Sequence, residues 1–82
     1  MDSLLINQIV AKVAELVRQP AAVRVFAVWP DGEVTEEGFG FRGVRCPDGS
    51  LEEPVATFVS GARLSPDKIR ARIERGARSR GL

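Results

Sequence analysis

One short segment, residues 22–29, constrains the fold of this chain more than any other. It reads Ala-Val-Arg-Val-Phe-Ala-Val-Trp, which is rich in β-branched and aromatic residues and too short for a good helix, so it predicts a strand. Both faces of this strand are mostly apolar: one has Val23, Val25, Ala27 and Trp29, and the other has Arg24, Phe26 and Val28. A strand of this kind belongs in the centre of a sheet, with a helix covering at least one side.

The segment before this strand predicts a helix over residues 3–18. Apolar side chains recur there at spacings of three and four, with polar residues between them, as in an amphipathic helix. Asp2 or Ser3 can cap its start, and Pro20 ends it because proline disfavours helical geometry at the preceding residue. Leu4 and Leu5 widen the apolar stripe, so we expect this helix to bury more than one flank.

A second helix is predicted near the end of the chain. Ser65 is a good N-cap, and Pro66 is favoured in the first turn of a helix. The helix is expected to run from Pro66 to about Arg75, with Gly76 as its stop. Residues 77–82 are then expected to form a basic, flexible tail, outside a folded core of residues 1–76.

Two further strands are predicted between the first strand and the last helix. The turn Pro30-Asp31-Gly32 leads into a strand over Val34–Cys46, in which glycines at alternate positions indicate a bulge. The turn Pro47-Asp48-Gly49 precedes a third strand over Val55–Ser60. The prediction is therefore one α+β domain over residues 1–82, with a helix, a three-stranded antiparallel β-meander and a C-terminal helix (αβββα), and with both helices on one face of the sheet.

The absence of histidine and tyrosine from the 82 residues argues against an enzyme. Histidine is the usual general base and metal ligand at neutral pH. The neighbouring glutamates Glu36-Glu37 and Glu52-Glu53 read as solvated surface rather than as acid/base pairs. Cys46 is the one cysteine and has no partner for a disulfide or a zinc site. We therefore expect no catalytic residues, no metal and no cofactor.

Charge is divided along the chain although the net charge is only +1. Residues 63–82 hold seven basic and two acidic residues, whereas residues 30–53 hold seven acidic and two basic ones. A basic end and an acidic end would steer the encounter with a charged partner. Six of the seven basic residues are arginine, which pairs bidentately with carboxylates and phosphates. A solvated helix face or a GC-rich genome would also account for this enrichment.

The stretch Gly38-Phe39-Gly40-Phe41 is similar to the RNP1 element of RNA-recognition motifs and cold-shock domains. In those families, aromatic residues of this element stack on bases, so the resemblance implies a role for Phe39 and Phe41 in RNA binding. The other interpretation, which we favour, is that both rings are core residues under the helices.

The order of the predicted elements resembles that of the double-stranded RNA-binding domain. In that family the start of the final helix presents a cluster of lysines to phosphates. The resemblance implies that Lys68, Arg70 and Arg72 would occupy these positions.

We expect a small non-catalytic regulatory protein that binds a protein partner, such as an inhibitor, an adaptor or a phage or plasmid accessory factor. The expected contact residues are Trp29, Arg42, Arg45, Lys68, Arg70, Arg72 and Arg75. A homodimer through Leu4, Leu5 and Ile9 is a possible extension. The alternative is a nucleic-acid-binding module that uses the arginine-rich C-terminal helix, including Arg78 and Arg80.

The location expected from the sequence is the cytoplasm, without contact with a membrane. The longest apolar run, Val25–Trp29, is far shorter than the ~18–20 residues of a membrane helix. The start of the chain, Met1-Asp2-Ser3, also lacks the basic residues of a secretory signal.

Overall fold

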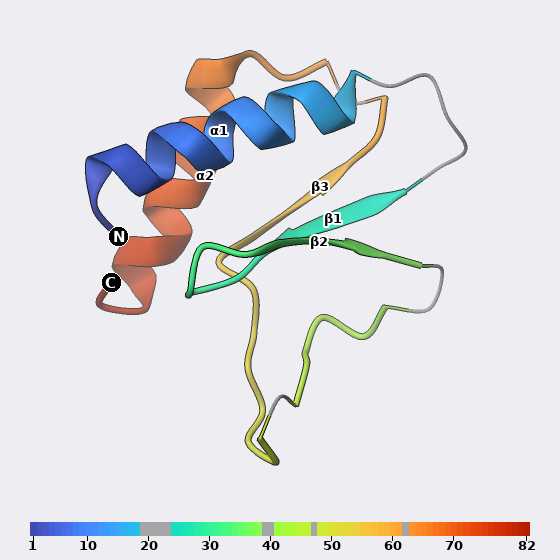
Figure 1. Ribbon diagram of the computed structural model, residues 1–82, viewed down its shortest axis with the longest axis vertical. Coiled ribbons are helices and arrows are strands. Elements are labelled where there is room, and N and C mark those ends of the chain that lie inside the picture. Colours follow the sequence, from blue (N-terminus) through green and yellow to red (C-terminus); the bar gives the residue numbers. More distant parts are fainter. Residues whose placement is uncertain (19–23, 39–40, 47, 62) are drawn as a thin grey trace.

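The computed structural model describes residues 1–18, 24–38, 41–46, 48–61 and 63–82, which form a three-stranded antiparallel sheet with two helices on one face (Figure 1). The elements are helix α1 (Ser3–Val17), strands β1 (Val25–Val28), β2 (Val34–Glu37) and β3 (Ala56–Val59), and helix α2 (Pro66–Ser79). The predicted α+β class and element order are confirmed. Pro20 and the first two residues of the predicted first strand lie outside the described residues.

Strand β1 lies in the centre of the sheet, as its two apolar faces predict, because the strand order is β2-β1-β3. This order differs from the predicted meander, in which the second strand would be central. β2 ends at Glu37, and the chain then leaves the sheet and returns along the other edge of β1. The isolated bridge between Arg45 and Glu52 holds this excursion together, so the predicted long strand Val34–Cys46 is wrong beyond Glu37.

The β1–β2 hairpin has the turn chemistry that its sequence predicts. The Trp29 amide donates to the Glu33 carbonyl, and the Gly32 amide donates back to the Trp29 carbonyl, each at 2.8 Å. Gly32 has φ +90°, a conformation that favours glycine. The side chain of Leu5 packs directly on Gly32, which couples the turn to α1.

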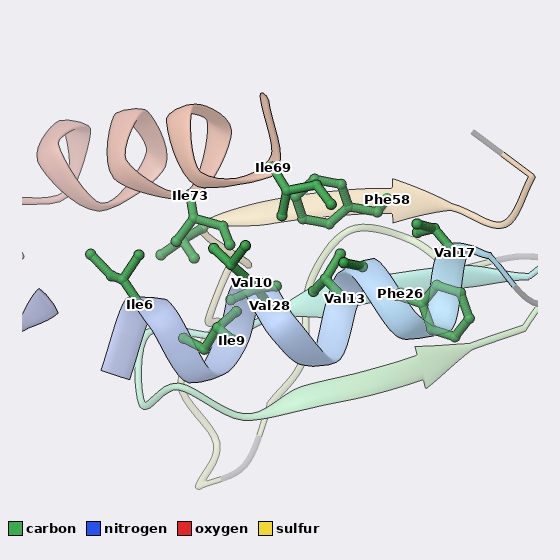
Figure 2. Packing of buried hydrophobic residues seen from close by; sticks show 12 residues of the cluster. Ile6, Ile9, Val10, Val13, Val17, Phe26, Val28, Phe58, Ile69 and Ile73 are labelled. Atoms are coloured by element: carbon green, nitrogen blue, oxygen red, sulfur yellow. The ribbon is translucent and has the colours of Figure 1, made fainter. Parts of the chain in front are cut away.

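The core lies between the helices and one face of the sheet (Figure 2). α1 begins after Asp2, whose carboxylate accepts from the Leu5 amide at 2.7 Å. The sheet contributes aromatic and β-branched side chains, and both helices contribute aliphatic ones. The cluster consists of Ile6, Ile9, Val10, Val13, Ala14, Val17, Phe26, Val28, Val55, Phe58, Ile69 and Ile73.

Helix α2 is longer than predicted and passes through Gly76 without a break. Gly76 has a packing role, because a Cβ at this position would come within 1.8 Å of the Val55 carbonyl oxygen. Beyond it, Ala77 is buried, and the Arg80 guanidinium donates to the Pro54 carbonyl at 2.9 Å. The predicted end at Gly76 is therefore wrong: glycine lets α2 approach the sheet closely rather than stopping the helix.

Candidate functional site

The residues expected to contact a partner fall into two regions on opposite sides of the sheet. Trp29 and Arg45 lie on the face away from the helices, because Trp29 alternates with the core residue Val28 and Arg45 packs on the Trp29 ring. Lys68, Arg72 and Arg75 lie on α2, on the helical side. The two regions differ in whether their charges already have partners within the chain.

The first region, which we call the Arg45 cluster, consists of Arg45, Trp29, Asp31, Glu33 and Glu52. Three carboxylates surround the guanidinium: Glu33 at 2.9 Å, Glu52 at 3.0 Å and Asp31 at 3.3 Å. The hydrogen bond to Glu52 is the main cause that raises the pKa of Arg45 above its already high value, while desolvation lowers it. The cation of Arg45 is thus fully engaged inside the chain.

Trp29 forms the floor of the Arg45 cluster and is completely buried, with 0% of its surface exposed. The guanidinium carbon of Arg45 lies 4.1 Å from the centroid of the Trp29 ring. The Phe41 ring contacts the Trp29 ring edge-on, with 6.1 Å between the two ring centroids. The indole Nε1 donates to the Thr35 hydroxyl at 2.6 Å, and that hydroxyl donates to Glu37 at 2.7 Å. Trp29 therefore seals the sheet and offers no ring to a partner.

Phe41 packs in this cluster and not under the helices, so the prediction that places it there is wrong. It is half-buried against Trp29, on the opposite face of the sheet from Phe26 and Phe58. The excursion after β2 brings it to that face. Phe39 lies outside the described residues.

Other carboxylates of the acidic segment are also paired within the chain. Arg24 contacts Glu36 at 3.3 Å, and Arg80 contacts Glu53 at 3.2 Å. Asp48 accepts hydrogen bonds from the hydroxyl and the amide of Ser50, which lower the pKa of its carboxyl group. Five of the seven carboxylates of residues 30–53 thus contact an arginine of the chain, and three of these five share Arg45.

The predicted dimer face is divided by the fold. Ile9 belongs to the core and is 3% exposed, and Leu5 is half-buried against Gly32. Leu4 is 69% exposed and stands alone of the three on the surface. The wide apolar stripe of α1 is explained by burial on two flanks, one toward α2 and one toward the β1–β2 hairpin. A helix that packs against two neighbouring elements needs more than one apolar side.

The second region is the outward face of α2. With 3.6 residues per turn, three exposed basic residues lie on the side away from Ile69 and Ile73, and a fourth, Arg72, lies on the adjacent flank that faces β3. We call them the basic stripe: Lys68, Arg72, Arg75 and Arg78. Glu74, four residues before Arg78, borders the end of the stripe and lines a hollow together with Arg78, Met1 and Ile6.

Most of the basic stripe has no partner in the part of the chain that the structure describes. Among the described residues, the side chains of Lys68, Arg75 and Arg78 form no ion pair and no hydrogen bond. Arg72 also lacks a carboxylate, but its guanidinium donates to the Thr57 carbonyl at 2.7 Å and lies 4.6 Å from the centre of the Phe58 ring. The stripe therefore presents four cations to solvent, and one of them is held in place.

The other two predicted contact residues do not join the stripe. Arg70 is half-buried on the flank of α2 that turns toward the core, and Arg42 is exposed in the excursion after β2. Arg78 joins it instead, because α2 continues beyond Gly76. It lies three residues after Arg75 and so about one turn further along, but that signal has a meaning only once the helix is known to extend so far.

The described residues contain neither a group of acidic and cysteine side chains that could hold a metal ion nor a helix long and apolar enough to cross a membrane. Comparison of the chain with models of protein families, with curated proteins and with solved structures gives no match.

Proposed function

We propose that this chain is a non-catalytic nucleic-acid-binding domain that contacts phosphates with the basic stripe of α2. One observation supports this proposal above all others: Lys68, Arg75 and Arg78 have no anionic partner among the described residues, whereas the arginine of the Arg45 cluster has three. Cations that neutralise phosphates release condensed counterions, and this release provides most of the sequence-independent affinity for nucleic acids.

The composition of the stripe also favours phosphates over a typical protein surface. Protein interfaces have an apolar, often aromatic centre from which charged residues are depleted. The exposed residues between the cations of the stripe are Ala71 and Ser79, and neither is an anchor of this kind. Trp29, the aromatic anchor expected from the sequence, is buried on the other side of the sheet.

A protein with an acidic surface is the second candidate. Arginine pairs with carboxylates as readily as with phosphates. Leu51, 74% exposed in the excursion after β2, is an apolar side chain that could add to such an interface. The acidic end that first favoured a protein partner supports it less, because five of its seven carboxylates lie within ion-pair distance of an arginine of the chain.

A salt titration of binding to fluorescent 20-nucleotide probes tests the proposal. We expect duplex binding at low salt, with a log–log slope of about −2.7 to −3.6 for three to four neutralised phosphates. Replacing Lys68 and Arg75 together by glutamine should make this slope less steep by about 1.8. The matched control replaces Lys12 and Arg18 of the α1 segment, which changes the net charge equally outside the stripe.

Two results would reject the proposed function. One is the lack of binding to any duplex or single-stranded probe at low salt, which would favour the acidic protein. The other is an equal loss of affinity in the stripe variant and in its control, which would show a general effect of net charge.

A further inference from the structure

A hollow of about 420 Å³ separates the basic stripe from the free edge of β3. One side of it is formed by Ala56 and Thr57 of β3, and the other by Arg72, Arg75, Gly76 and Ser79 of α2. We call it the α2–β3 hollow. It lies beside the point at which Gly76 brings the backbone of α2 against the Val55 carbonyl.

Arg72 is held in this hollow by contacts that leave most of its donors free. Its Nη2 donates to the Thr57 carbonyl, and the plane of the guanidinium is supported by the buried ring of Phe58. A guanidinium has five N–H donors, so a single hydrogen bond leaves four for a ligand. Because the side chain is already ordered, a ligand would lose less conformational entropy on binding it.

Arg75 adds a second guanidinium to the same hollow, one turn further along α2. Like charges one turn apart on a helix repel each other. Among the described residues, no carboxylate lies within ion-pair distance of either arginine. An anion between the two side chains would remove this repulsion.

We infer that the α2–β3 hollow binds one phosphoryl group between the guanidinium groups of Arg72 and Arg75. A planar carboxylate pairs bidentately with one guanidinium, whereas the oxygens of a tetrahedral phosphoryl group can accept from two guanidinium groups that approach from different sides. This inference rests on the proposed function for its source, a phosphodiester of a nucleic acid. Free inorganic phosphate offers the same chemistry.

Nitrogen-15 NMR of the arginine Nε–H groups tests this site in the full-length chain. The Arg72 resonance should be displaced by the ring current of Phe58 and thus be resolved from the others. We expect inorganic phosphate, added at constant ionic strength, to shift the Arg72 and Arg75 resonances saturably, and chloride to leave them unchanged. A 20-base-pair duplex should shift the same two resonances.

Affinity measurements with single variants give an independent readout. We expect Arg72→Gln and Arg75→Gln each to weaken duplex binding about tenfold or more, as the loss of charge-assisted hydrogen bonds implies. The control Arg78→Gln removes a cation of the same stripe outside the hollow, so it should weaken binding less and leave the phosphate-induced shifts intact. Circular dichroism would verify that each variant is folded.

The outcomes separate this inference from the proposed function. If the duplex binds with a steep salt slope but phosphate shifts neither arginine, or if Arg72→Gln and Arg78→Gln lose equal affinity, the site in the hollow is rejected and nucleic-acid binding stands. If phosphate binds in the hollow and no nucleic acid binds, the site is supported as one for free phosphate and the proposed function is rejected.

Discussion

The Arg45 cluster and the basic stripe use the same residue type for different purposes. Arg45 lies on a buried tryptophan and is surrounded by three carboxylates within 3.3 Å. Arg75 and Arg78 project from α2 and have no carboxylate partner among the described residues. The comparison shows that the role of an arginine depends on the groups that the fold places around it, because a paired guanidinium stabilises the chain and an unpaired one is available to a ligand.

Truncation of Trp29 should have the largest effect on the Arg45 cluster. Trp29→Ala removes a fully buried ring, and we expect the free energy of unfolding to fall by about 3–5 kcal/mol. Urea denaturation followed by circular dichroism measures this loss. Leu4→Ala is the control, since Leu4 is mostly exposed and its truncation should change stability by no more than about 0.5 kcal/mol. A similar cost for both variants would contradict the buried position of Trp29.

The corresponding test near the basic stripe is Gly76→Ala. The new Cβ would overlap the Val55 carbonyl, so α2 must shift away from β3, and we expect a loss of about 1–3 kcal/mol. Gly38→Ala is the control, because nothing lies within 4 Å of the position of its Cβ. If thermal unfolding showed Gly76→Ala to be as stable as the native chain, the close approach of α2 to β3 would be wrong.

Replacement of Arg45 should destabilise the chain less than the truncation of Trp29. Arg45→Gln leaves the three carboxylates facing one another and uncovers the ring, so we expect a lower Tm and a red shift in the fluorescence of Trp29, the single tryptophan. The double variant with Glu33→Gln should recover part of the Tm by reducing the repulsion. An unchanged Tm and an unchanged emission maximum would show that the cluster does not hold the excursion after β2.

A matched replacement in the basic stripe should raise the stability of the chain rather than lower it. Arg75→Gln removes repulsion from neighbouring cations of α2, and we expect the chain without nucleic acid to gain about 0.2–0.5 kcal/mol of stability. Arg72→Gln is the comparison, because it also loses the contacts to Thr57 and Phe58. A clear loss of stability in Arg75→Gln would mean that Arg75 has a partner within the chain.

The smallest expected effect concerns Asp48, whose carboxylate is satisfied by Ser50 rather than by an arginine. Its pKa is lower in the folded chain than the ordinary value of ~3.9, so its stabilisation is complete above that value and is lost as the pH falls through the folded pKa. The carboxyl carbon of Asp48 should titrate below those of exposed aspartates in NMR spectra, and Ser50→Ala should reduce this difference, because it removes the hydroxyl and keeps the amide hydrogen bond. An ordinary titration midpoint of Asp48 in the native chain would refute the lowered pKa.

Much of the fold follows from local patterns in the sequence. The apolar spacing of residues 3–18, the β-branched and aromatic residues of the segment 22–29 and the caps at Asp2 and Ser65 predict elements that the structure contains. The two apolar faces of β1 indicate its central place, but the predicted meander put the second strand there, because local sequence does not show that the chain leaves the sheet after Glu37 and returns beside β1. The length of α2 was underestimated because a glycine that permits close packing resembles a glycine that ends a helix.

The candidate site was predicted only in part. The basic character of α2 is visible in the sequence, and Lys68, Arg72 and Arg75 do lie together on its surface. The sequence could not show that Arg45 is paired with carboxylates up to 14 residues away in the chain, or that Trp29 lies beneath it. It also could not reveal the α2–β3 hollow, whose walls come from segments that meet only in the folded chain.

The sequence by itself determined the elements of this protein, the central place of β1 and the excess of positive charge on the last helix. These are properties of composition and periodicity, which act over a few residues. The tertiary structure decided which charges are compensated. Whether an arginine meets a carboxylate, a ring or only solvent depends on contacts between distant segments, and these exist only once the sheet and the helices have packed together.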